Sequence, residues 1–224
     1  MAWASLLATR PDDELYERYL ASFRYYRNWH LEAANRNPAF IPWHTQAHYM
    51  VWQQRRDPAL ARFIFLTNDW LLREMHSPGA ASSPDMAGRF YKPGGAYGPP
   101  HASSTGVYLE GLIDAFCLAR ELGDTQREAA YRLAIRRGLR SVLQLTFGFG
   151  QPLWYIRQPQ RAFGGVRETV YHNEIRVDNV QHNLMAIMKI LRHFSREDFT
   201  HEDDEAPANQ APSSSPKPLG QPRQ

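Results

Sequence analysis

The chain has very little cysteine and no long apolar run. Its single cysteine, Cys117, has no partner for an internal disulfide, and the apolar residues around it predict a buried thiol. No apolar stretch reaches the roughly 18 residues of a membrane-spanning helix, and the first residues lack the basic start of a secretion signal. We therefore expect no contact with a membrane, and a reducing compartment, the cytoplasm.

Lysine is also scarce, because only three of the 26 basic residues are lysines and the rest are arginines. The net charge is +3, and the acid-rich segment from residue 196 onward leaves the excess positive charge in residues 1–195. The arginines are scattered among acids, and no basic helix face alternates with aromatic residues. This distribution predicts no nucleic-acid partner.

The C-terminal segment has the composition of a disordered tail. It combines an acidic run with Pro, Ser and Gln and contains almost no apolar residues. Such a segment buries too little apolar surface to offset the entropy that ordering costs. The sequence therefore predicts a folded domain over residues 11–194 and a disordered tail over residues 200–224.

Within the folded domain the apolar residues recur at the three- and four-residue spacing of α-helices. Candidate N-caps precede four of the segments: Asp12 or Asp13, Asp57, one of Ser103, Ser104 and Thr105, and Asp124. No pair of strands is indicated, so the predicted fold class is all-α. The expected helices cover residues 11–34, 43–55, 57–76, 105–122, 125–147 and 176–194, with irregular segments before the fourth and the sixth.

These helices form three pairs, in which the second, fourth and sixth begin with polar residues and then become apolar. With the stretch FGGVRETVYHNEIRVDNVQHNL and the aromatic-rich loops, this rhythm resembles the α/α toroid of glycoside hydrolases, polysaccharide lyases and sugar epimerases. The resemblance covers residues 11–194 and implies that the second, fourth and sixth helices line a central cavity. A full toroid has six hairpins, so this array of helical hairpins makes about half of one. The missing half belongs to a longer chain or a second copy, or the array is open.

The densest group of chemistry-bearing residues surrounds the start of the sixth helix. Asp178, Gln181 and His182 are spaced to share one helix face. Paired carboxylates, histidines and tyrosines supply the proton donors and acceptors of acid–base chemistry on sugars. The alternative is that these groups cap the helix or satisfy buried backbone. The loop before them adds candidate ligand-binding residues: Arg167, Tyr171, His172 and Arg176.

Two other segments offer candidates at the expected cavity mouth. His101 directly precedes the fourth helix, on which Glu110 and Asp114 lie one turn apart as a carboxylate pair that would suit a hydrolase. His44 and His48 lie one turn apart on the second helix, but Thr45 stands where zinc proteases have their catalytic Glu, and no third ligand is evident. We expect His101, Glu110, Asp178 and His182 to be catalytic, His44 to face the ligand, and no metal.

Loop aromatics and arginines complete the predicted binding surface. Tyr91 and Trp154 lie in irregular segments, where an aromatic ring is available to stack on the apolar face of a sugar. Arg89, Arg167 and Arg176 suit the carboxylate of an acidic sugar, because guanidinium binds carboxylate in a bidentate manner. No phosphate-binding loop or serine nucleophile motif is present, so no cofactor is expected. The leading hypothesis is a carbohydrate-active or carbohydrate-binding domain, and the alternative is a non-catalytic helical scaffold that binds a protein.

Overall fold

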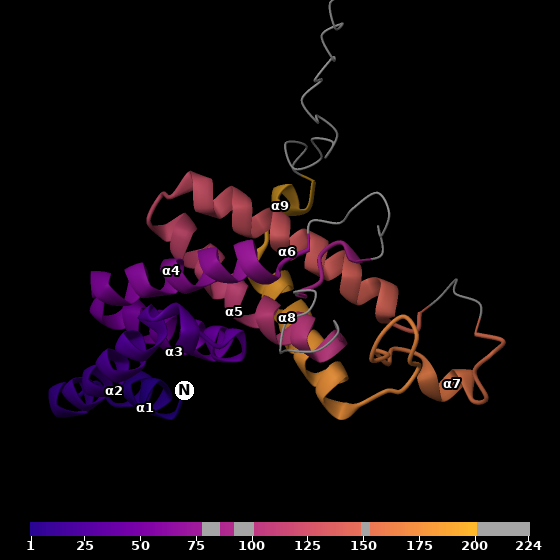
Figure 1. Cartoon of the computed structure of the whole chain (residues 1–224), viewed down its shortest axis with the longest axis horizontal. Helices are drawn as coiled ribbons and strands as arrows, with labels where there is room; N and C mark the ends of the chain where they lie inside the picture. Colours follow the sequence, from indigo (N-terminus) through magenta and orange to yellow (C-terminus); the bar gives the residue numbers. More distant parts are fainter. Residues whose placement is uncertain (78–85, 92–100, 149–152, 201–224) are drawn as a thin grey trace, which may run out of the picture.

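The computed structural model describes residues 1–77, 86–91, 101–148 and 153–200, and these residues form an all-α fold (Figure 1). Within them extended pairing is limited to three isolated bridges, for example between His76 and Phe90. The helices are α1 (Ala2–Thr9), α2 (Asp13–Leu31), η1 (Ala33–Asn35), η2 (Pro38–Phe40), α3 (Ile41–Arg55), α4 (Pro58–Met75), α5 (Ala102–Glu121), α6 (Thr125–Leu145), α7 (Pro159–Ala162), α8 (Val177–His193) and α9 (Arg196–Thr200).

The helix starts follow the expected capping chemistry with one exception. Asp12, Asp57 and Asp124 each accept a hydrogen bond from a backbone N–H in the first turn of α2, α4 and α6, as predicted. The prediction of a Ser or Thr cap for α5 is wrong. This helix begins at Ala102, and the ring of His101 accepts the bond from the backbone N–H of Ser104.

Packed helices also lie outside the expected limits of residues 11 and 194. Ala4 and Leu7 of α1 are buried in the main core. At the other end, Asp198 of α9 is buried and accepts a hydrogen bond of 2.6 Å from Nη2 of Arg120. The expected tail lies outside the described residues except for Thr200, the last residue of α9.

Helix α5 is the centre of the fold. It packs most extensively against α8, α6 and α3, and most of its residues are buried. Helices α3, α5 and α8 are the three that the sequence pattern placed on the inner side, and α5 lies between the other two. Helix α4 covers α3, α6 covers α5, and α1, α2 and α7 lie toward the two ends of the molecule (Figure 1).

Close helix packing depends on glycines in α5. A Cβ atom at Gly111 would lie 2.5 Å from Cα of Pro42 in α3, and one at Gly106 would lie 2.8 Å from the backbone N of Asn183 in α8. Both obstructing atoms belong to the backbone of another helix, so they cannot rotate away. These two glycines therefore set the separation of the three inner helices.

The substitution Gly111→Ala should destabilise the protein. Overpacking against fixed backbone costs about 1–3 kcal/mol, which exceeds the roughly 1 kcal/mol that alanine gains over glycine in a helix. We expect a net loss of up to about 2 kcal/mol in chemical denaturation. Gly148→Ala is the control, because its nearest neighbour is a backbone oxygen 3.9 Å away. Equal stability of the two variants would contradict this account.

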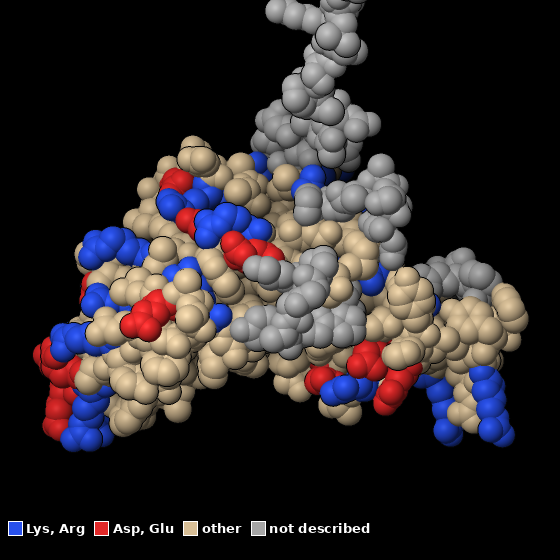
Figure 2. All heavy atoms as spheres, viewed as in Figure 1, with Lys and Arg blue, Asp and Glu red and all other residues tan. Residues whose placement is uncertain are grey.

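The surface carries mixed charges. On the face shown in Figure 2, acidic and basic side chains of the described residues are interspersed, and no continuous region of one sign covers it. None of the helices in the described ranges is both long and apolar enough to cross a bilayer. Cys117 is partly buried, and burial raises the pKa of its thiol to about 12, so the thiol stays protonated at neutral pH.

Candidate functional site

A buried carboxylate–imidazole pair joins the first halves of α5 and α8. Glu110 is fully buried, and its Oε1 lies 2.7 Å from Nδ1 of His182. Burial raises the pKa of Glu110, while the bond to His182 opposes that shift. Its other oxygen, Oε2, is buried without a hydrogen-bond partner among the described residues. When ionised, Glu110 accepts the Nδ1 proton of His182 and leaves Nε2 as the basic nitrogen of a neutral ring.

A second ion pair continues the same interface one turn further along. Nζ of Lys189 lies 2.8 Å from Oδ1 of Asp114 and also donates to the backbone oxygen of Glu110 at 2.7 Å. Burial raises the pKa of Asp114, and the nearby Lys189 ammonium opposes that shift. Two acids one turn apart on α5, Glu110 and Asp114, are therefore each bonded through the carboxylate to a basic residue of α8, and these two basic residues lie two turns apart.

A hollow opens beside this interface, where α3, α5 and α8 come together. Its volume is about 280 Å³, and the ring of His182 forms part of its wall. The indole of Trp43, which is 40% exposed, meets that ring edge-on at a centroid distance of 5.8 Å. The hollow is lined by Ala39, Trp43, His101, Ser103, Ser104, Val107, Tyr108 and His182.

The first turn of α5 supplies a second imidazole to this hollow. Nδ1 of His101 accepts the backbone N–H of Ser104 as the helix cap, and Oγ of Ser103 lies 2.8 Å from the same nitrogen. Because Nδ1 is the acceptor, the hydroxyl of Ser103 donates and the ring proton resides on Nε2. Burial lowers the pKa of His101, so this ring is neutral at pH 7. Two imidazoles and the hydroxyl of Ser103 thus line one hollow, and the buried Glu110 lies behind the ring of His182.

Asp178, the fourth predicted catalytic residue, is paired with Arg176 and does not line the hollow. Its carboxylate accepts two hydrogen bonds of 3.1 Å from the guanidinium of Arg176, which also reaches Glu168 at 3.5 Å. Gln181 is exposed on the outer side of α8. The shared face expected for Asp178, Gln181 and His182 is therefore divided, and only His182 lines the hollow.

Two residues predicted to face the ligand, Arg89 and His44, do not line the hollow. Arg89 is 2% exposed, with its guanidinium beside the sulfur of Met86, so its expected role in binding a sugar carboxylate is wrong. His44 lies against the rings of His30 and His48, away from the hollow. Helical spacing and loop composition do not reveal which side chains the tertiary fold covers.

The remaining predicted binding residues lie apart from the hollow. Trp154 and Tyr171 are each 85% exposed, and His172 is exposed near them in sequence. Arg167 donates to the backbone oxygen of Gln144 and lies over the ring of Phe147. Tyr91 is partly buried, and its backbone N–H donates to the backbone oxygen of Met75. None of these residues lines the hollow described above.

Sequence reasoning missed Lys189 and undervalued Ser103. The signal for Lys189 was available, because it lies seven residues after His182 and therefore on the same face of its helix, just as Asp114 lies four residues after Glu110 on one face of the neighbouring helix. Ser103 was considered only as a cap. Its contact with His101 depends on the helix starting three residues earlier than expected.

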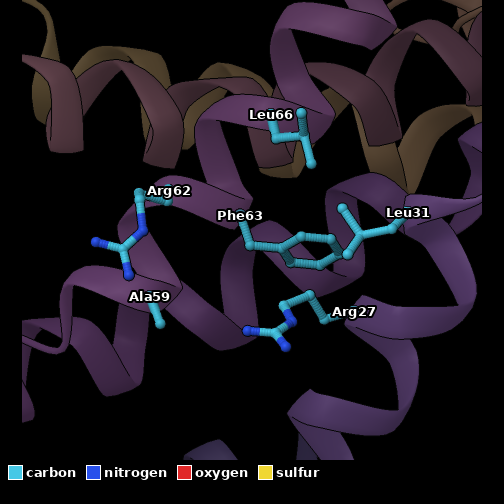
Figure 3. Close-up of a pocket in the computed structure, with 6 residues that line it drawn as sticks. All are labelled: Arg27, Leu31, Ala59, Arg62, Phe63 and Leu66. Carbon is cyan, nitrogen blue, oxygen red and sulfur yellow. The ribbon is translucent and has the colours of Figure 1, made fainter.

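A second hollow, between α2 and α4, lacks acid–base groups. Arg27 reaches into it from α2 and Arg62 from α4, and the ring of Phe63 points toward Leu31 (Figure 3). Its volume is about 210 Å³, and no carboxylate or imidazole lines it. The hollow at α3, α5 and α8 is therefore the candidate functional site.

Comparisons with known proteins add nothing to this geometry. No protein-family model, no curated protein and no solved structure matches the chain. Over the described ranges no three His, Cys, Asp or Glu side chains are grouped so as to hold a metal ion. The chemistry of the site therefore has to be argued from its own side chains.

Proposed function

We propose that the hollow at α3, α5 and α8 binds a sugar, and that His182 and Glu110 transfer a proton to or from it. The observation that carries the proposal is the buried Glu110, bonded to a ring that shares a wall with Trp43 and His101. A carboxylate behind an imidazole fixes its tautomer and stabilises the imidazolium that forms when the ring accepts a proton. This arrangement suits proton transfer in hydrolysis, β-elimination or epimerisation.

The shape and lining of the hollow support a sugar ligand. Its 280 Å³ lies near the lower end of the roughly 300–1,000 Å³ typical of ligand pockets, which suits one sugar unit. The exposed part of the Trp43 indole offers an apolar face for the C–H side of the ring. His101, Ser103 and Ser104 offer partners for its hydroxyl groups. An acidic sugar places its carboxylate toward solvent, since Arg89 is buried elsewhere.

The helix arrangement supports a partial toroid. Helices α3 and α8 both pack on α5, and the hollow lies near the starts of α5 and α8. We propose that this is about half of an α/α toroid, with the segment beyond α9 as a disordered tail. The ring is completed by a longer chain or a second copy.

Binding to a panel of oligosaccharides, with and without uronic acid units, tests the proposal. We expect Trp43→Ala to weaken binding at least about tenfold, equivalent to about 1.4 kcal/mol. Trp29→Ala is the matched control, because Trp29 is an exposed tryptophan of α2 that does not line the hollow. His182→Gln should retain part of the binding and lose turnover.

The scaffold alternative makes the opposite prediction. If Glu110 and His182 only satisfy each other, His182→Gln lowers the melting temperature and the parent protein binds no glycan of the panel. That combination would overturn the sugar proposal.

A further inference from the structure

Helix α8 has a buried face and an exposed face of similar length. The buried face faces α5, and within the described chain α5 is the helix against which α8 packs extensively. It consists of Asn179, Asn183, Ala186 and Ile190, which are spaced by four, three and four residues. A helix that packs on a single neighbour leaves its opposite side uncovered. The residues on that side show whether it is polar, as expected for a surface in contact with solvent, or apolar.

The free side of α8 is apolar. Leu184 is 53% exposed and Leu191 is 70% exposed. The exposed positions are spaced by four, three, four and three residues, which is the spacing of the seam between two paired helices. The stripe, called here the α8 seam, consists of Val177, Gln181, Leu184, Met188 and Leu191.

No other segment of this chain has the composition to cover the α8 seam. The 24 residues from 201 to 224 include one large apolar residue, Leu219. The segments 78–85, 92–100 and 149–152 add only Tyr97 and Phe149. A helix partner needs several apolar residues at helical spacing, and none of these segments supplies them.

The charges beside the seam complement those of a second copy of α8. Asp178 and Arg192 flank the seam on the side of Met185, which lies seven residues from each of them. An antiparallel copy of α8, related by a two-fold axis near Met185, places Asp178 beside Arg192 of the second copy, twice. It also opposes the two helix dipoles. Arg192 is exposed, and Asp178 retains lone pairs beyond those that Arg176 occupies.

We propose that the protein forms a two-fold symmetric dimer through antiparallel pairing of the α8 seam with the same seam of a second copy. Such an isologous interface requires a self-complementary surface. The seam meets this requirement in both shape and charge. The positions of the seam are distributed evenly about Leu184 and Met185. Asp178 and Arg192, which flank the seam, lie near its opposite ends.

The oligomeric state of the full chain tests the proposal by light scattering or sedimentation over a wide micromolar range. We expect a dimer for the parent protein and a dissociation constant raised at least about a hundredfold by Leu184→Glu. Leu143→Glu is the matched control, because Leu143 is a 56% exposed leucine of α6 outside the seam. Circular dichroism confirms that the variants stay folded. A monomeric parent at the highest concentration overturns the proposal.

A charge swap tests the antiparallel geometry. Arg192→Asp brings two acids together at each end of the seam and should weaken the dimer, as should Asp178→Arg. The double variant D178R/R192D restores both pairs and should recover dimer affinity. If α8 instead packs against the α1–α2 end of another copy, the double variant shows no recovery, and the antiparallel pairing is wrong.

Discussion

Replacing Lys189 with methionine is expected to lower the free energy of unfolding by about 3 kcal/mol. The change removes the only ammonium bonded to Asp114 among the described residues and leaves a buried carboxylate with no opposite charge. The backbone oxygen of Glu110 also loses its bond from Nζ. Chemical denaturation at neutral pH measures the effect. Arg18→Met, which removes the cation of the exposed pair between Arg18 and Glu14, is the reference. Its free energy of unfolding should change by less than about 1 kcal/mol, because surface ion pairs contribute little.

The double variant D114L/K189M distinguishes the destabilisation caused by one unpaired buried charge from the net contribution of the ion pair to the free energy of unfolding. When both charged groups are replaced by apolar ones, no buried charge remains, and such replacements are often neutral or stabilising. We therefore expect the double variant to be more stable than Lys189→Met alone. If the double variant is less stable by the sum of the two single changes, Asp114 and Lys189 do not interact in the folded protein.

Acid is expected to destabilise the protein through a row of histidines between α2 and α3. His44 packs against His30 and His48 with ring centroids 5.5 Å and 5.4 Å apart. Burial lowers the pKa of all three rings, to about 4 for His44, and the N-terminal ammonium lowers it further at His44 and His48. The hydroxyl of Tyr19 bonds to His48, while Tyr26 and Phe40 face His44 and offer no charge.

The sign of the pH dependence follows from these shifts. A histidine whose pKa is lower in the folded state takes up its proton more readily when unfolded, so stability falls as pH drops below about 6.5. A pKa of about 4 at His44 corresponds to about 3 kcal/mol lost between pH 7 and pH 4. Glu110 and Asp114 act in the opposite sense, because their raised pKa values favour the protonated folded state at acid pH.

A variant comparison isolates the histidine contribution. His44→Phe keeps an aromatic ring but removes the titration, so its stability should fall less between pH 7 and pH 4.5 than that of the parent. His172→Phe makes the same change at an exposed histidine and should leave the pH dependence unaltered. Melting temperatures measured across this range give the result. Parallel curves for His44→Phe and the parent would show that the pKa of His44 is the same in the folded and unfolded states.

The helices were predictable because local chemistry determines them. Aspartate caps and the apolar period placed α2, α4 and α6 close to their observed limits. Helix α1 was missed, because eight residues are too few to show a clear period. Helix α5 starts at Ala102 because the ring of His101 acts as an uncommon N-cap, which the standard preference for Ser or Thr does not anticipate.

The site was predictable only in part, since it depends on contacts between helices. His101 and His182 were found because each lies in or before the first turns of an inner helix, and neighbouring inner helices bring such positions together. The partner of Glu110 and the burial of Arg89 depend on the packing of distant segments. A single sequence contains no signal for the rotation of α8 about its axis, which directs His182 inward and Gln181 to solvent.

The central position of α5 has a consequence for how the protein opens. Since α3, α6 and α8 all pack on α5, no movement exposes α5 without displacing at least one of them. Its backbone amides therefore become accessible only in openings that approach global unfolding, whereas α1 and α9 at the periphery open at lower free energy. Glu110, on the α5 side of the candidate site, therefore lies in the part of the fold that opens at the highest free energy.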